Sequence, residues 1–193
     1  MEPATGVRQD LTEGLPPEFA AKFHKGSVYL IKERQPLQGY SVFNGLVGLE
    51  PPGLCVSTVF PDHVRQQYRV GDVRIVWLAD TPGDDCVPPT ALTSLFQAIV
   101  TFVNAHPGGS VLLFDGLERL ISRNGFGPAL EWVERLSEFV AREPAIVLVP
   151  FSPETVDGEG LANLERALRT LDGGALAEEL AAAELSRTLM GPD

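Results

Sequence analysis

The sequence has 193 residues, of which 44% are hydrophobic and 21% are charged, and its formal net charge is -11. This composition excludes a disordered chain and is that of a globular protein with a sizeable core. The negative charge argues against binding to nucleic acid or anionic lipid, and no apolar run approaches the roughly 18 residues of a membrane span, so we expect a cytoplasmic protein.

Residues 1–25 lack periodicity and are expected to form a flexible N-terminal arm, with the folded unit beginning at Gly26. Several of the runs that follow are apolar on consecutive residues, which is typical of strands buried on both faces of a parallel sheet. Such runs, bounded by glycine, proline or charge, predict strands at residues 27–31, 54–60, 73–80, 110–115 and 145–151.

Helical periodicity separates these strands. Apolar residues recur on one helical face, and proline or glycine ends each segment. The helices predicted on this basis cover residues 92–103, 130–140 and 161–171, with weaker signals at 40–49 and 62–68. Alternating strands and helices predict one α/β domain over residues 26–172, with three layers and a mostly parallel central sheet of about five strands.

Residues 173–193 are rich in alanine, glutamate and leucine and are expected to form a C-terminal helical tail. Leu176, Leu180, Ala183 and Leu189 recur roughly on one face of this helix. A helix of this length gains most of its stability by burying its apolar face. It should therefore dock either on its own domain, which we favour, or on a second copy, which would make a homodimer.

The segment SVLLFDGLERL places Asp115 at the carboxyl end of a buried strand, followed by Glu118 and Arg119. In P-loop ATPases such an aspartate helps to hold the catalytic magnesium ion. A strand that simply ends in an Asp-Gly turn has the same pattern. We expect Asp115 to serve the fold, accepting hydrogen bonds from the turn at Gly116 and Leu117 or from a neighbouring strand end.

A magnesium nucleotide would also need a GxxxxGK[ST] loop after the first strand. The segment that follows that strand is KERQPLQGYSVF, which has one glycine, Gly39, and no lysine before the hydroxyl residue. Pro36 supplies no N–H group, and Glu33 would repel phosphate. We predict that this loop binds neither ATP nor GTP. A loop packed down by Pro36 and Leu37 would support this prediction, whereas an anion against the amides of residues 35–40 would support a ligand site.

No other catalytic, metal or cofactor site stands out. His24, His63 and His106 lack metal-ligand spacing, and Cys55 and Cys86 form no CxxC pair. The carboxylates at 84–85 follow Pro82-Gly83 and indicate a polar turn, and the two tryptophans, at 77 and 132, indicate packing residues. The segment SRNGFGP, which contains Arg123, fits either an Asn-Gly turn, which we favour, or an anion site.

Over residues 26–168 the segments GSVYLI, IVWLAD, VPPTALTSLFQAIVTFV, VLLFDGLERLISRNGF, AIVLVPFSPETV and LANLERAL together resemble the archaeal domain of unknown function family 835. The resemblance implies a RecA-like topology of the P-loop NTPase type, in a core that has lost its phosphate loop. It also implies a signalling or regulatory role, and it supplies no reaction.

Two functions remain open. The first is a non-catalytic interaction module that contacts a protein partner of a signalling system through a surface containing Asp115, Glu118, Arg119 and Arg123, or through the helical tail. The second is a protein that binds a nucleotide or another small ligand at an unconventional phosphate site. The missing lysine and glycines favour the first.

Overall fold

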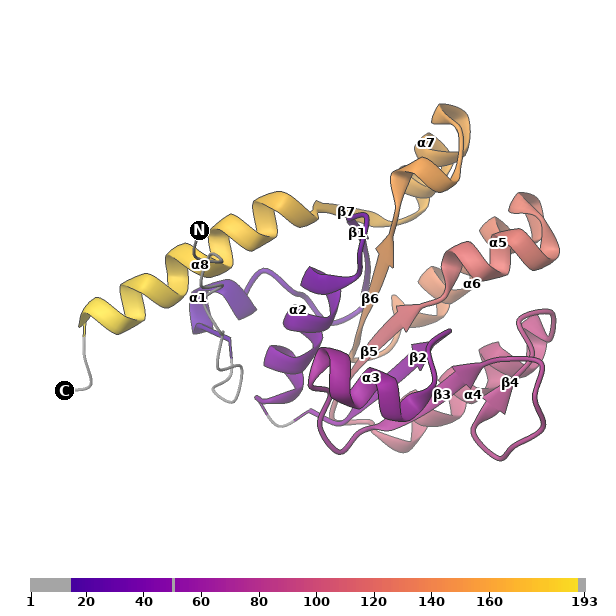
Figure 1. The fold of residues 1–193 in the computed structure, drawn as a ribbon, viewed down its shortest axis with the longest axis horizontal. Helices are drawn as coiled ribbons and strands as arrows, with labels where there is room; N and C mark the ends of the chain where they lie inside the picture. Colours follow the sequence, from indigo (N-terminus) through magenta and orange to yellow (C-terminus); the bar gives the residue numbers. More distant parts are fainter. Residues whose placement is uncertain (1–14, 50, 191–193) are drawn as a thin grey trace, which may run out of the picture.

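The computed structural model describes residues 15–49 and 51–190, in which seven parallel strands form one sheet. The strand order across the sheet is β4-β3-β2-β5-β6-β1-β7 (Figure 1). The strands are β1 (Ser27–Lys32), β2 (Gly53–Ser57), β3 (Arg74–Leu78), β4 (Cys86–Val87), β5 (Ser110–Asp115), β6 (Ala145–Phe151) and β7 (Arg169–Asp172).

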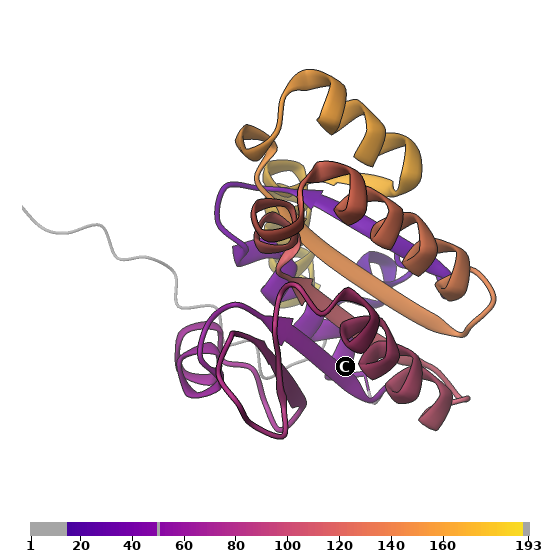
Figure 2. The same ribbon diagram turned by 90° about the vertical axis from the view of Figure 1, so that its right-hand side faces the viewer.

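Helices cover both faces of the sheet (Figures 1 and 2). One face packs against α4 (Leu92–Ala105), α5 (Leu117–Asn124), α6 (Phe126–Val140) and α7 (Gly158–Ala167). The other packs against α1 (Pro17–Ala20), α2 (Leu37–Val47), α3 (Pro61–Tyr68) and α8 (Gly173–Met190). A short 3-10 helix, η1 (Pro153–Thr155), follows β6.

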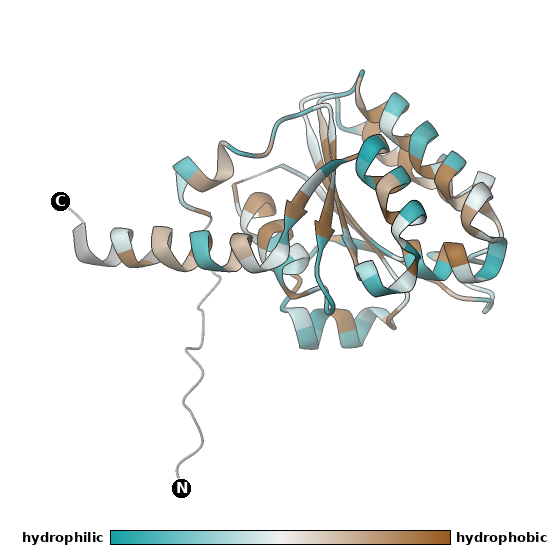
Figure 3. Ribbon diagram, turned by 90° about the horizontal axis from the view of Figure 1, so that it is seen from above, coloured by the Kyte–Doolittle hydropathy of each residue, from teal (hydrophilic) through white to brown (hydrophobic). Residues whose placement is uncertain are grey.

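The central strands supply both halves of the core, because successive side chains of a strand point to opposite faces. In β5, Leu112 and Phe114 pack in the cluster under α4 to α7, whereas Val111 and Leu113 pack in the cluster under α2. All seven residues of β6 are buried. Figure 3 shows the strands as the most hydrophobic part of the ribbon, as expected for strands covered on both faces.

The predicted three-layer α/β architecture is confirmed, but the sheet has seven strands where about five were expected. The additional strands lie at the two edges. The two-residue strand β4 is too short to give a pattern. Leu168 and Leu171 suggested a helix that continued to 171, yet α7 ends at Ala167, and the next residues pair with the open edge of β1 from Tyr29↔Arg169 to Lys32↔Asp172.

Packing begins before Gly26, where the sequence placed the start of the folded unit. Leu15, Phe19 and Phe23 are buried in the cluster that contains α2. Gly45 admits Leu15, since a Cβ at that position would lie 2.3 Å from the Leu15 Cγ. The part of the expected flexible arm at residues 1–14 lies outside the described residues.

The C-terminal tail is helical and docks on its own domain through its first half. Leu176 and Leu180 are buried in the same cluster as α2, and Glu179 pairs with Lys22. Further along, Leu185 is 64% exposed, and α8 extends away from the domain (Figure 1). The side chain of Leu189 and residues 191–193 lie outside the description, and the homodimer stays a prediction.

Candidate functional site

The strand order creates a switch point between β2 and β5. The chain leaves β2 through α3 to reach β3 on one side, and it leaves β5 through α5 and α6 to reach β6 on the other side. Ser57 and Asp115 end these two strands in register. In open α/β sheets, ligands bind outside the carboxyl ends of the strands at such a point.

A pocket of about 690 Å³ opens at this switch point. We call it the strand-end pocket. The ends of β2, β3 and β5, the first turns of α5 and the end of η1 contribute to it. Its lining comprises Thr58, Trp77, Leu78, Ala79, Asp80, Asp115, Gly116, Glu118, Arg119, Ser122 and Thr155.

Asp115 lines the pocket and is held by two hydroxyl groups. The Tyr40 hydroxyl donates to Asp115 Oδ2 over 2.9 Å, and the Ser57 hydroxyl donates to the same oxygen over 3.3 Å. Tyr40 is buried, and its ring stacks on Tyr68 at a centroid distance of 3.7 Å. Ser57 is thus the expected donor on a neighbouring strand end. The second donor is Tyr40 of α2, in place of the turn at Gly116 and Leu117.

Glu118 is committed to a structural contact. Its Oε1 accepts a hydrogen bond of 2.8 Å from the backbone N–H of Ser152, which ties the start of α5 to the end of β6. Burial raises the pKa of Glu118, and the hydrogen bond from Ser152 offsets part of this rise. Burial also raises the pKa of Asp115, against the effect of its bonds to Tyr40 and Ser57. Both carboxylates are therefore desolvated groups beside an open pocket.

The two arginines of the predicted interaction surface differ in their contacts. Arg119 is exposed, lines the pocket and forms no ion pair with any residue that the structure describes. Arg123 pairs with Asp80 over 3.0 Å, which links α5 to the segment after β3. Because Asp80 neutralises it, the anion site considered for the segment around Arg123 has no support in this geometry.

In the loop between β1 and α2, the carboxylate of Glu33 occupies the N-terminus of α2, which is the position where a nucleotide phosphate would bind. Glu33 accepts hydrogen bonds from the backbone N–H groups of Gln38, over 2.8 Å, and Gly39, over 2.9 Å. These groups belong to the first turn of α2, where backbone donors and the helix dipole favour an anion. The N–H groups of Leu37 and Tyr40 bond to backbone carbonyls.

Gly39 permits this close arrangement. A Cβ at Gly39 would lie 2.4 Å from the Pro150 side chain and 3.1 Å from Glu33 Oε1. Leu37 does not pack the loop down, since this residue is 50% exposed. The loop is held instead by Glu33, whose pKa burial raises to about 7 against the two hydrogen bonds.

All four residues of the predicted surface therefore lie at the carboxyl edge of the sheet, and three of them line one pocket. Sequence reasoning missed Trp77 as a lining residue, because its position in an apolar strand indicated packing only. It also missed Asp80, although this residue closes the segment IVWLAD just beyond a strand end. Trp132, by contrast, is buried as expected.

Within the described parts of the chain, no group of three or more histidine, cysteine, aspartate or glutamate side chains is arranged to hold a metal ion. In the same parts, no helix has both the length and the apolar character needed to cross a membrane.

Comparisons with known proteins identify a family and a fold. Residues 32–168 match the family described as "Protein of unknown function (DUF835)", and no curated protein matches the sequence. Among solved structures, PH0250 from Pyrococcus horikoshii OT3 is similar, with a TM-score of 0.57, 16% identity and coverage of 82% of this chain and 87% of that chain.

The flagellar accessory protein FlaH from Methanocaldococcus jannaschii is also similar, with a TM-score of 0.49, 13% identity and coverage of 87% of this chain and 78% of that chain. At these identities the likeness concerns the fold alone.

Proposed function

Since this chain belongs to the DUF835 family of proteins of unknown function, as its match over residues 32–168 establishes, we propose that it is a cytoplasmic, non-catalytic module for signalling or regulation. In this proposal the strand-end pocket and its rim bind a protein partner. Asp115 and Glu118 line the inner part of the surface, and Arg119 and Arg123 stand at its exposed part.

The contact of Glu33 with the first turn of α2 carries the proposal. A nucleotide phosphate needs free N–H donors at this position, usually with a lysine. Here the carboxylate uses the donors of Gln38 and Gly39 and adds negative charge. Binding of Mg-ATP would require Glu33 to leave and its charge to be overcome, which argues against nucleotide chemistry at this loop.

The position and shape of the pocket support a binding role. It lies at the switch point, it is open to solvent, and its lining includes the exposed arginine Arg119 and the aromatic residue Trp77. Phe60, which is 45% exposed, packs edge-on against Trp77. Exposed aromatic and arginine side chains are enriched where proteins bind proteins. Asp115, held by two hydroxyl groups, contributes shape and charge to this surface.

Blocking the pocket tests the proposal. Ser122 is exposed and lines the pocket, so Ser122→Trp should fill it without disturbing the core. We expect immobilised wild-type protein to retain a defined partner from native lysate. The Ser122→Trp variant should retain at most about a tenth as much of this partner, which is on the order of the loss expected from a disrupted interface. Thr101→Trp, on an exposed position of α4, is the matched control and should retain the partner.

Equal retention of the partner by the wild type, Ser122→Trp and Thr101→Trp would refute the interaction surface.

Calorimetry with Mg-ATP and Mg-GTP tests the proposal that the protein binds no nucleotide, and we expect no saturable heat at micromolar affinity. Magnesium-dependent binding that disappears in Asp115→Ala would instead favour the second function, a nucleotide site of unconventional form.

A further inference from the structure

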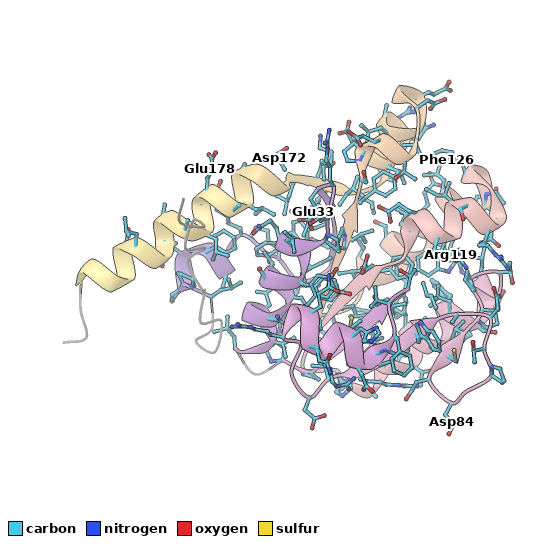
Figure 4. All side chains as sticks on the ribbon, in the orientation of Figure 1. Glu33, Asp84, Arg119, Phe126, Asp172 and Glu178 are labelled. Atoms are coloured by element: carbon cyan, nitrogen blue, oxygen red, sulfur yellow. The ribbon has the colours of Figure 1, made fainter. Side chains whose placement is uncertain are left out.

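A second pocket adjoins the strand-end pocket. This helix pocket, of about 440 Å³, lies between α5, α6 and α7 and is lined by Ile121, Phe126, Thr155, Val156, Asp157, Glu159, Gly160 and Asn163. Thr155 lines both pockets, and the neighbouring residues Ile121 and Ser122 of α5 line one each. The two hollows are therefore neighbours along the carboxyl edge of the sheet, and we refer to them together as the groove. Figure 4 shows the labelled residues Arg119 and Phe126 on this side of the molecule.

The groove combines apolar and acidic walls. In the helix pocket, Ile121, Phe126 and Val156 are half-buried and offer apolar surface. In the strand-end pocket, Trp77 offers an aromatic surface. The carboxylates that line the groove are Asp80, Asp115, Glu118, Asp157 and Glu159, and Arg119 is its one basic lining residue among those the structure describes. With Asp80 paired to Arg123, four carboxylates without a cationic partner in the described part of the chain remain against Arg119. Two of them also accept backbone hydrogen bonds, Glu118 from Ser152 and Asp157 from Gly160.

This charge balance selects the kind of partner. A desolvated carboxylate gains from a nearby cation, which favours its charged form, and an arginine or lysine side chain can also lie against an aromatic ring such as Trp77. The net charge of -11 attracts basic partners at longer range. An acidic partner would be repelled by both the groove and the whole protein.

We propose that the groove binds an extended protein segment in which a basic residue enters the strand-end pocket and an apolar residue enters the helix pocket. This inference rests on the proposed function, because it names the chemistry of the protein partner at the same surface. Two adjoining pockets with different walls suit successive side chains of one extended chain, which would use both the charge and the apolar surface.

The test uses the full-length protein and a labelled hexapeptide that alternates leucine and arginine, followed by fluorescence anisotropy. We expect saturable binding that weakens with salt, since the attraction is partly electrostatic. Peptides that alternate leucine with glutamate, or glycine with arginine, separate the two contributions. The leucine–glutamate peptide should not bind, and the glycine–arginine peptide should bind several-fold more weakly, because it lacks an apolar side chain for the helix pocket.

Charge variants test the location. Glu159 is exposed, so Glu159→Lys should fold normally and weaken binding of the leucine–arginine peptide about fivefold or more, whereas Arg119→Glu should strengthen it by a similar factor. Glu178→Lys makes the same charge change on α8, far from the groove in Figure 4, and should alter binding less than about twofold.

Absence of saturable binding, equal binding of the leucine–glutamate peptide, or equal effects of Glu159→Lys and Glu178→Lys would overturn the inference. These results remain distinguishable from failure of the proposed function. If Ser122→Trp still abolished partner capture while the charge variants had no effect, the surface would be correct and the basic segment wrong. If Ser122→Trp left partner capture unchanged, the surface itself would be refuted.

Discussion

Glu33→Gln should remove a large part of the pH dependence of stability between pH 4.5 and about pH 7. The lower limit is the ordinary pKa of the Glu33 carboxyl, and the upper limit is its pKa in the folded protein. Because burial raises the pKa in the folded protein, the folded state binds more protons than the unfolded state in this range. The free energy of unfolding of the wild-type protein therefore falls as the pH rises through about 7, and the stabilisation is complete only below about 4.5.

The size of this change in the free energy of unfolding follows from the shift in the Glu33 pKa. The full pKa shift would correspond to about 3 kcal/mol, and solvent screening of this partly exposed group reduces the value to about 1–2 kcal/mol. Urea unfolding at about pH 5 and about pH 8 measures the difference for the wild type and for Glu33→Gln. Asp115 and Glu118, whose pKa values burial also raises, contribute with the same sign and leave some slope in the variant.

Glu138→Gln is the control, because it removes one exposed carboxylate from α6 and should keep the wild-type slope. Parallel stability curves for the wild type and Glu33→Gln would contradict the prediction. Such a result would mean that the pKa of Glu33 is not raised in the folded protein, either because its carboxylate is solvated or because the hydrogen bonds from Gln38 and Gly39 fully offset its burial.

Tyr40→Phe should destabilise the protein by about 1–3 kcal/mol, because it removes a hydrogen-bond donor from the half-buried carboxylate of Asp115. The ring can keep its stacking on Tyr68, but Asp115 Oδ2 would retain only the longer bond from Ser57. A partly desolvated carboxylate that loses a donor carries a free-energy cost. Chemical denaturation near neutral pH measures the loss directly.

Tyr68→Phe is the matched control, since the Tyr68 hydroxyl forms no hydrogen bond with the residues that the structure describes. Its cost should stay below about 0.5 kcal/mol. A double-mutant cycle with Asp115→Asn then isolates the pairwise contribution of Tyr40 and Asp115. A coupling energy near zero would show that the hydroxyl and the carboxylate act independently and would refute the interpretation of this network.

The central part of the fold was predictable because burial on both faces leaves a direct trace in the sequence. Runs such as those of β5 and β6 are apolar at consecutive positions, as strands covered on both faces require. The edges were not predictable on this basis. β7 is half-exposed, and its leucine spacing fits a helix as well as a strand, so pairing with β1 decided its structure.

The candidate site was predictable only where a residue ends a strand. Asp115 followed an apolar run, and its place at the sheet edge was therefore evident. The partners of its carboxylate were not, because Tyr40 reaches it from α2, far along the chain. Glu33 likewise indicated repulsion of phosphate, but its contact with the first turn of α2 depends on how the short loop folds back, which no local pattern encodes.

The position of β1 sets a limit on any shortened form of this protein. The family match covers residues 32–168, whereas nearly all of β1 precedes this range and β7 follows it. A fragment cut to the matched residues would lose the strand that lies between β6 and β7. The backbone of β6, buried along its whole length, would become an open edge with unpaired hydrogen-bonding groups, and such apolar edges promote aggregation. We therefore expect a stably folding fragment to begin before residue 32, so that it retains β1 beside β6.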